Sequence, residues 1–313
     1  MNNLIVSVSP HFHKKSATTR RIMGDVCIAL MPALIASCVI FGLRSLLLVA
    51  VSAANCVLLE WLWTKLMKKT QTVGDLSAVV TGILIAFNVP SSMPVWQLLV
   101  GDFIAIVIVK MLFGGIGCNF ANPAIVGRIS MMLSFTTSMT TYGCEVAKVD
   151  VLSSATPLAA LETGSLGMNN FMTLFLGQHG GVLGETCALA LLLGGIYLVV
   201  RGVIKPTIPV TFLASAFVFT ALFTGFDFNR AFMSLFAGGL MLGAIFMATD
   251  YVTSPMTGKG QLIFGIGCGF LTAAIRIFAN SAEGVSFAIL LMNLLVPYIN
   301  SASVTKPVGG VKA

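Results

Sequence analysis

Ten apolar runs, separated by short polar segments, limit what this chain can fold into. A helix that crosses the hydrocarbon core of a bilayer needs about 20 apolar residues, or fewer where neighbouring helices bury it. Only 9% of the 313 residues are charged, against about 25% in an average soluble domain, so lipid must cover most of the surface. We therefore expect an all-α, polytopic membrane protein with ten transmembrane helices. The predicted spans are residues 24–42, 44–63, 76–90, 96–113, 120–135, 184–201, 207–224, 232–248, 261–278 and 285–300.

The third and fifth predicted spans are short and are interrupted by proline. Pro90 ends the third span, Pro94 precedes the fourth, and Pro123 lies near the start of the fifth. An interrupted helix leaves backbone groups unpaired, which is tolerated only where other helices or a cavity surround it. These breaks predict a functional centre inside the bundle.

The basic residues predict the orientation of the chain in the membrane. If the N-terminus is cytoplasmic, thirteen of the 18 Lys and Arg residues lie in cytoplasmic segments and four lie in extracytoplasmic segments. Arg128 falls within a span. This excess of basic residues on the inside favours that orientation. The first 23 residues are polar and basic, without the apolar core of a cleavable signal. No aromatic residues interleave the basic clusters, so membrane topology explains the net charge of +7 better than nucleic-acid binding does. The predicted segments are a cytoplasmic N-terminal segment (1–23), a first five-helix repeat (24–135), an extracytoplasmic loop (136–183), a second five-helix repeat (184–300) and a cytoplasmic tail (301–313).

A short internal repeat supports the division into two halves. Phe120-Ala121-Asn122-Pro123-Ala124 recurs as Phe278-Ala279-Asn280-Ser281-Ala282, and the same offset places the first three spans close to the sixth, seventh and eighth. Five spans is an odd number, so the two halves would cross the membrane in opposite directions. The chain is therefore predicted to be an inverted repeat with some broken helices.

The loop between the halves contains the segment Asp150-Val151-Leu152-Ser153-Ser154-Ala155-Thr156-Pro157. A threonine followed by proline and an apolar run is typical of a helix N-cap with proline at the first helical position. The free amides and the dipole of a helix N-terminus also favour a phosphate group. Thr156 can therefore cap a helix and carry a phosphoester at the same time.

Three segments together resemble a known family of membrane redox subunits. The loop segment Asp150-x-x-Ser153-Ser154-Ala155-Thr156 is similar to the flavin-transferase acceptor pattern Asp-x-x-Ser/Thr-Gly-Ala-Thr, with Ser154 in place of the usual glycine. With the segments at 114–128 and 247–255, the chain resembles the D subunits of Rnf electron-transport complexes. The B subunits of sodium-pumping NADH:quinone reductases are close relatives of these.

The resemblance implies a function for the loop. FMN would be attached covalently through its phosphate to Thr156 by a flavin transferase, with Asp150, Ser153, Ser154, Ala155 and Pro157 around it. The complex would pass electrons between ferredoxin and NAD⁺, coupled to Na⁺ or H⁺ translocation across a bacterial plasma membrane. Its partners would be an iron–sulfur membrane pair and a second FMN-carrying subunit. The sodium-pumping relatives also carry a non-covalent flavin, so a second flavin such as riboflavin stays open.

Several polar residues lie within or beside the spans, where an uncompensated charge costs several kcal/mol. Asp102 is a candidate for a cation or proton role, although it could equally stabilise a broken helix. Lys110 lies eight residues further along the same helix, about 12 Å away and too far to pair with Asp102, so both are expected to find partners on other helices. We expect Lys110 to extend its ammonium to the membrane surface. The other candidates for an ion or second-flavin site are Asn122, Arg128, Asp250, Thr253 and Ser254, with helix capping as the alternative for the last three.

Other site classes are not supported. None of the seven cysteines forms a Cys-x-x-Cys pair, and His11, His13 and His179 lack metal-ligand spacing, so no metal site and no side-chain catalytic residue is predicted. A solute channel or transporter with a urea-transporter-like inverted repeat remains the alternative function. A channel would have no use for the segment that ends at Thr156.

Overall fold

A computed structural model describes residues 18–142, 171–177, 179–279 and 284–303. The segment predicted to accept FMN, including Thr156, lies outside these residues. The described residues form helices and turns, with one isolated β-bridge between Pro90 and Val182. The all-α prediction is therefore confirmed for the part of the chain that the structure describes.

The first half begins with two long helices, α1 (Thr19–Phe41) and α2 (Leu43–Leu66), which only Gly42 separates. Gly42 has a φ of 77°, a conformation that favours glycine and lets the chain reverse within one residue. A 3₁₀ turn, η1 (Val73–Asp75), leads into the short α3 (Ser77–Phe87). The remaining elements are α4 (Val95–Phe103), its π-helical continuation η2 (Ile104–Met111), α5 (Pro123–Ser134) and the short α6 (Thr136–Thr140).

The second half is also helical, and one of its helices is broken. A short helix, α8 (Phe171–Leu176), precedes this half. Its eighth predicted span is broken into α11 and α12–η4, which meet at 68°. The elements are α9 (Ala188–Val200), α10 (Thr207–Phe223), α11 (Phe228–Phe236), α12 (Leu240–Leu242), π-helical η4 (Gly243–Met247), α13 (Gly258–Phe278) and α14 (Gly284–Ser303).

Every predicted span contains a described helix, but their lengths differ. α1, α2, α13 and α14 are long and apolar enough to cross a membrane, and the bent pair α11 with α12–η4 would make a fifth span. The shorter apolar helices α3, α5, α9 and α10 have 11, 12, 13 and 17 residues. The chain therefore has the helices of a membrane protein, while the count of ten spans and the inverted repeat stay predictions.

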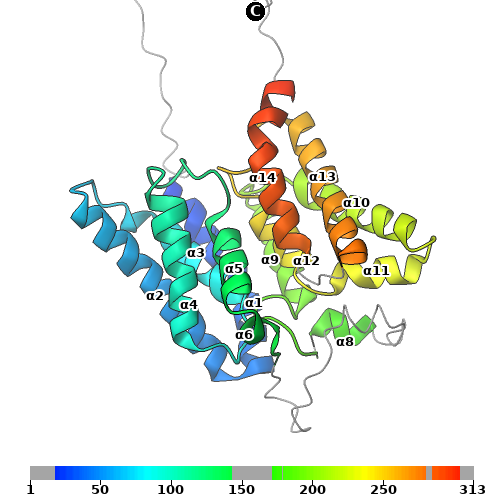
Figure 1. Cartoon of the computed structure of the whole chain (residues 1–313), viewed down its shortest axis with the longest axis horizontal. Helices are drawn as coiled ribbons and strands as arrows, with labels where there is room; N and C mark the ends of the chain where they lie inside the picture. The colour runs from blue at the N-terminus through cyan, green and yellow to red at the C-terminus, as the bar shows by residue number, and fades with distance from the viewer. Residues whose placement is uncertain (1–17, 143–170, 178, 280–283, 304–313) are drawn as a thin grey trace, which may run out of the picture.

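The two halves lie side by side and meet through the middle of the molecule (Figure 1). α2 and α4 lie at one end of the view, and α10 and α13 lie at the other. α1 packs against α9 at the boundary, where a Cβ atom on Gly194 would overlap the carbonyl oxygen of Ala29. The absence of a side chain at Gly194 therefore allows the two backbones to approach closely.

Arginine side chains bind the carbonyl groups that the helix breaks leave unpaired. Arg44 Nη2 lies 3.3 Å from the Ser92 oxygen and 3.4 Å from the Met93 oxygen, in the break between α3 and α4. Buried Arg276 donates to the Ser234 and Ala237 oxygens, at 2.9 and 3.1 Å, where α11 ends. These bonds satisfy backbone groups that could not be left unpaired within a bilayer.

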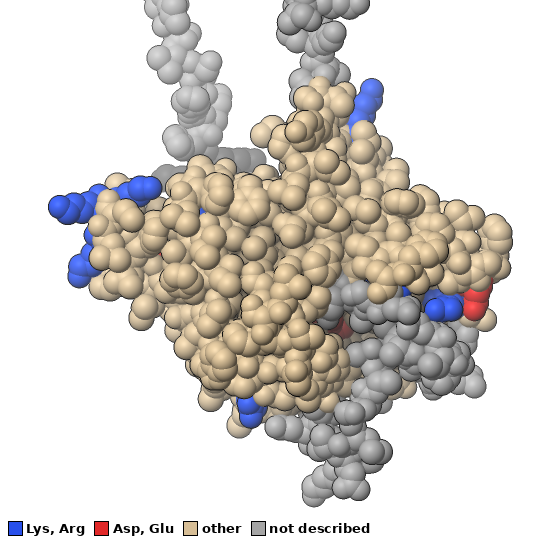
Figure 2. Space-filling view, in the orientation of Figure 1, with Lys and Arg blue, Asp and Glu red and all other residues tan. Residues whose placement is uncertain are grey.

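Most of the face in Figure 2 carries no charged side chain, and Lys and Arg side chains lie at its margins. Large hydrophobic side chains are exposed along α1 and α2, among them Ile35, Val39 and Leu58. Lys110, however, is only 2% exposed, so the prediction that it extends to the membrane surface is wrong. It forms an ion pair inside the bundle instead.

Candidate functional site

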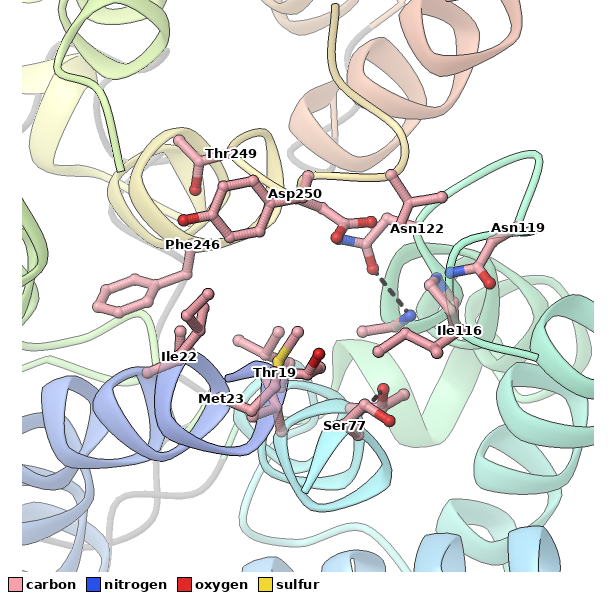
Figure 3. A pocket seen from close by; sticks show the side chains of 18 of the residues that line it. Thr19, Ile22, Met23, Ser77, Ile116, Asn119, Asn122, Phe246, Thr249 and Asp250 are labelled. Atoms are coloured by element: carbon pink, nitrogen blue, oxygen red, sulfur yellow. Dashed lines mark hydrogen bonds between the residues drawn. The ribbon is translucent and has the colours of Figure 1, made fainter. Parts of the chain in front are cut away.

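A cavity of about 350 Å³ lies between the two halves, and side chains from six elements line it. α1 and α3 contribute one wall, η2 and α5 a second, and α9 and η4 a third (Figure 3). Ile22, Met23 and Phe246 make part of the wall apolar, while Asn119, Asn122 and Asp250 bring polar groups to it. An apolar cavity with a few polar groups is the usual form of a small-molecule site.

Asn122 joins the two halves at this cavity. Its side-chain oxygen accepts from the Ala124 amide at 3.0 Å, which caps the N-terminus of α5 ahead of Pro123. Its Nδ2 donates at 3.0 Å to the oxygen of Met247, the last residue of η4. The prediction that Asn122-Pro123 starts a broken helix is confirmed, and the residue also fixes η4 of the second half against it.

Asn293 of α14 adds a second link at the same place. With its amide oriented to suit both neighbours, its oxygen accepts from the Asn122 amide at 3.2 Å and its nitrogen donates to the Thr253 oxygen at 3.0 Å. Asn293 is 2% exposed and was not among the predicted site residues. Two asparagines from different halves therefore hold the turn after η4 against the start of α5.

Asp250 lies in this turn, past the end of η4, and its side chain reaches the cavity (Figure 3). Thr253 Oγ1 donates to Asp250 Oδ2 at 3.0 Å, and the Ser254 amide donates to the Asp250 backbone oxygen at 3.1 Å. Burial raises the pKa of the Asp250 carboxyl, because desolvation disfavours the ionised form more than the hydrogen bonds from Thr253 and from the Val252 and Tyr251 amides favour it. Asp250, Thr253 and Ser254 thus form one polar turn, of which Asp250 lines the cavity.

Lys110 and Ser77 border the same cavity from η2 and α3. Lys110 Nζ lies 2.7 Å from Glu60 Oε2 and 2.6 Å from Ser77 Oγ, so its charge is balanced by a carboxylate of α2. The wall therefore includes an ion pair rather than an isolated charge. The prediction that Lys110 finds its partner on another helix is confirmed.

Arg128 and Asp102 lie in two other buried clusters. Arg128 of α5 donates to Asn88 at the end of α3 and to Glu185 ahead of α9. Asp102 is fully buried and accepts from Ser52 Oγ at 2.7 Å and from Asn55 Nδ2 at 3.1 Å, both on α2. The six inner residues that the sequence suggested thus belong to three separate places, and only Asn122 and Asp250 line the cavity.

Sequence reasoning missed the partners of these residues. Glu60, Asn88 and Glu185 each balance or accept from a buried cation, and all three are at most 6% exposed. One signal was available, because Glu60 is an acidic residue inside an apolar run and needs a cation nearby. Among the described residues, no group of three or more His, Cys, Asp or Glu side chains could hold a metal ion.

Comparison with known proteins gives the family. A model of the NQR2, RnfD, RnfE family matches residues 5–309. The chain belongs to this family. It is 46% identical to the D subunit of the Na⁺-translocating ferredoxin:NAD⁺ oxidoreductase complex of Acetobacterium woodii, over 95% of this chain and 92% of that protein. It is 37% identical to the D subunit of the proton-translocating ferredoxin:NAD⁺ oxidoreductase complex of Clostridium ljungdahlii, over 98% and 96% of the two chains. A third relative, the D subunit of the ion-translocating oxidoreductase complex of Actinobacillus succinogenes, is 35% identical over 93% and 94%.

Proposed function

We propose that the chain is the D-type membrane subunit of an Rnf-type complex, which moves electrons between ferredoxin and NAD⁺ and couples them to Na⁺ or H⁺ translocation. The similarity to two ferredoxin:NAD⁺ oxidoreductase subunits along almost their full lengths supports this role. The chain would act as one part of a translocase and would not be catalytic alone. Its partners would be an iron–sulfur membrane pair and a second FMN-carrying subunit in a bacterial plasma membrane. The family favours this role over a solute channel.

FMN on Thr156 is the central part of the proposal. The acceptor-like segment from Asp150 to Thr156 supports it, together with the excess of basic residues that places this loop on the outer face. A flavin there would supply one- and two-electron chemistry, while the protein supplies its position and its electrostatic surroundings. Because the segment lies outside the described residues, this assignment rests on the sequence.

In-gel fluorescence of the denatured protein, co-expressed with a flavin transferase, tests the attachment. We expect a fluorescent band from the wild type and none from Thr156→Ala. Thr163→Ala is the matched control, because it removes a threonine hydroxyl of the same loop outside the acceptor-like segment and should keep the fluorescence. A dark wild-type band, or fluorescence that survives Thr156→Ala, rejects the assignment. Mass spectrometry of the peptide 150–162 would then locate any modified residue.

We also propose that the cavity between the halves binds the second, non-covalent flavin. Its volume of about 350 Å³ is within the range of small-molecule pockets, about 300 to 1,000 Å³. The Asn119 side-chain oxygen has no hydrogen-bond partner among the described residues, so a ring N–H group could donate to it. Asn119, Thr249 and Asp250 would bind the polar edge of a planar ring system, and Ile22 and Phe246 would contact its faces. A flavin there would accept and release single electrons between the two sides of the membrane.

A further inference from the structure

The buried face of α2 is polar, which is the reverse of a helix in a soluble protein. Ser52, Cys56, Glu60 and Thr64 follow one another at intervals of four residues, and all are buried. Four residues is about one helical turn, so these side chains form a single stripe. Exposed Leu58 and Leu62 lie on the opposite side. Because a polar group buried within a membrane is costly, the stripe requires an explanation.

At one end of the stripe, a chain of contacts leads to the surface. Glu60 pairs with Lys110, Lys110 donates to Ser77, and Ser77 Oγ donates to Asp75 Oδ1. Thr72 donates to the other oxygen of Glu60. Thr72 and Asp75 are partly exposed and lie in the connection between α2 and α3. The buried ion pair is therefore linked to solvent by hydroxyl and carboxyl groups.

At the other end of the stripe, Ser52 contacts Asp102 of α4. The Ser52 oxygen lies 2.7 Å from Asp102 Oδ1 and 2.9 Å from the Gly82 oxygen of α3. A serine hydroxyl carries one hydrogen, so it can donate to only one of these two acceptors at a time. The close approach of α2 and α3 holds the three oxygens together, since a Cβ atom on Gly82 would lie 2.7 Å from the Ala53 Cα atom. A proton on Asp102 would supply the missing hydrogen, because Asp102 could then donate to Ser52 while Ser52 donates to the Gly82 oxygen.

Among the described residues, no cationic side chain pairs with Asp102, because the nearby cations are bound to other groups. Its helix packs against α2, α3 and α5. On α2 the nearest titratable group is the Cys56 thiol, and α3 carries no titratable side chain. Arg128 of α5 bonds to Asn88 and Glu185, and Lys110 bonds to Glu60. An ionised Asp102 would have only neutral partners, Ser52, Asn55 and the weakly donating Cys56 thiol, which compensate poorly for the lost hydration of a buried carboxylate.

We propose that Asp102 is a proton-binding site of the first half, and that Ser52 is the positioning residue that stabilises both of its forms. When the proton is bound, the Asp102 O–H donates to the Ser52 oxygen, and the Ser52 hydroxyl donates to the Gly82 oxygen. When the proton leaves, the Ser52 hydroxyl turns and donates to the carboxylate. The Ser52–Asp102 separation of 2.7 Å is that of an O–H···O hydrogen bond.

This site stands apart from the flavin assignments, and only its part in ion coupling rests on the proposed function. Glu60 lies two turns of α2 from Ser52, on the same face and with Cys56 between them, so buried polar side chains line α2 from Asp102 toward the partly exposed Thr72 and Asp75. A flavin found elsewhere than on Thr156 would leave this inference unchanged. Conversely, a failure at Asp102 would say nothing about FMN.

Infrared difference spectroscopy of the purified full-length protein in lipid nanodiscs tests the inference. We expect a protonated-carboxyl C=O band near neutral pH that shifts in D₂O, disappears in Asp102→Asn and declines in one step as the pH is raised. Asp25→Asn is the matched control, since Asp25 pairs with Arg201 at 3.2 Å and should contribute no such band. Ser52→Ala should shift the band, because it removes the oxygen that accepts from Asp102.

Three results would overturn the inference. The first is a band that is unchanged in a folded Asp102→Asn variant, or the absence of any such band in the wild type at every pH where it is folded. The second is a band that Na⁺ removes at constant pH, which would assign the site to a metal cation. The third is an unchanged band frequency in Ser52→Ala, which would remove the positioning role of the serine.

Discussion

Arg128 of α5 and Glu185, just ahead of α9, form a buried ion pair across the boundary between the two halves of the chain. Their side chains are 4% and 6% exposed, and Arg128 also donates to Asn88 where α3 ends. Three helices that are far apart in sequence are thus held at one point. Backbone bonds reinforce it, since the Leu183 and Gly184 amides donate to the Val89 and Phe87 oxygens at 3.1 and 2.9 Å.

Removing Arg128 should be strongly destabilising. Arg128→Met leaves Glu185 buried without this cation, and breaking one partner of a buried pair costs about 3 to 5 kcal/mol. Thermal unfolding of the purified protein in detergent measures the loss. Arg21→Met is the matched control, because Arg21 is exposed at the start of α1 and its replacement should cost about 1 kcal/mol or less. The double variant Arg128→Met/Glu185→Met should recover stability, and equal losses for the two single Arg variants would contradict the expectation.

Gly194 should tolerate no side chain where α9 meets α1. Gly194→Ala places a methyl group against the Ala29 carbonyl oxygen, and overpacking of this kind costs about 1 to 3 kcal/mol. Gly24→Ala in α1 is the control, because its nearest neighbour would be a Leu76 methyl group at 4.0 Å. That change should leave the melting temperature unchanged or raise it, since alanine favours a helix over glycine. A Gly194→Ala protein as stable as the control would mean that α1 and α9 separate easily.

The helices could be predicted from the sequence because apolar runs and proline positions act locally. The run at 44–63 became α2 (Leu43–Leu66), and the broken start at Asn122-Pro123 became the capped N-terminus of α5. The π-helical turns of η2 and η4 were not predicted, since nothing in an apolar run distinguishes a π-helix from an α-helix. The bend after Phe236 was also missed, because Gly238 and Gly239 lie inside an uninterrupted apolar run.

The sites were less predictable, because their residues meet only through packing. Asp102, Asn122, Arg128 and Asp250 were recognised as polar residues beside the spans, but their sequence order does not show that they belong to different clusters. Lys110 was misjudged because its partner Glu60 lies 50 residues away on α2. A charge near a helix end can be solvated or paired, and only the position of the neighbouring helix decides between the two.

Filling the cavity should expel a non-covalent ligand without affecting the loop. Met23→Trp adds a large ring to the cavity wall, so we expect less flavin to be released on denaturation, with covalent FMN unchanged. Met31→Trp is the control on the same helix, because Met31 is 46% exposed on the outer surface. Both quantities can be measured by chromatography of the extract and by in-gel fluorescence. An unchanged amount of released flavin in Met23→Trp would place that flavin elsewhere.

Asp250 should make stability depend on pH. Burial raises the pKa of its carboxyl above the ordinary value of 3.8, so the folded state binds this proton more tightly than the unfolded state does. Stability from this group is therefore complete below about pH 4 and is lost as the pH rises toward the folded-state pKa. Asp250→Asn cannot ionise and still accepts from Thr253, so its melting temperature should exceed that of the wild type by a margin that grows with pH. A margin that is constant or shrinks with pH would show that the carboxyl is not disfavoured.

The orientation in the membrane can be tested at Cys118. This thiol is exposed in the turn after η2, whereas the other described cysteines are buried or half-buried. The basic residues predict that this turn is cytoplasmic, so a membrane-impermeant maleimide should label Cys118 in inside-out vesicles and not in intact cells. Cys144, outside the described residues, is replaced by serine for this measurement, and Cys118→Ser gives the background. A second protein with Lys148→Cys and Cys118→Ser should show the opposite labelling. If position 148 reacts from the cytoplasmic side, the loop with Thr156 does not face outward, and a flavin there could not receive electrons on the outer face.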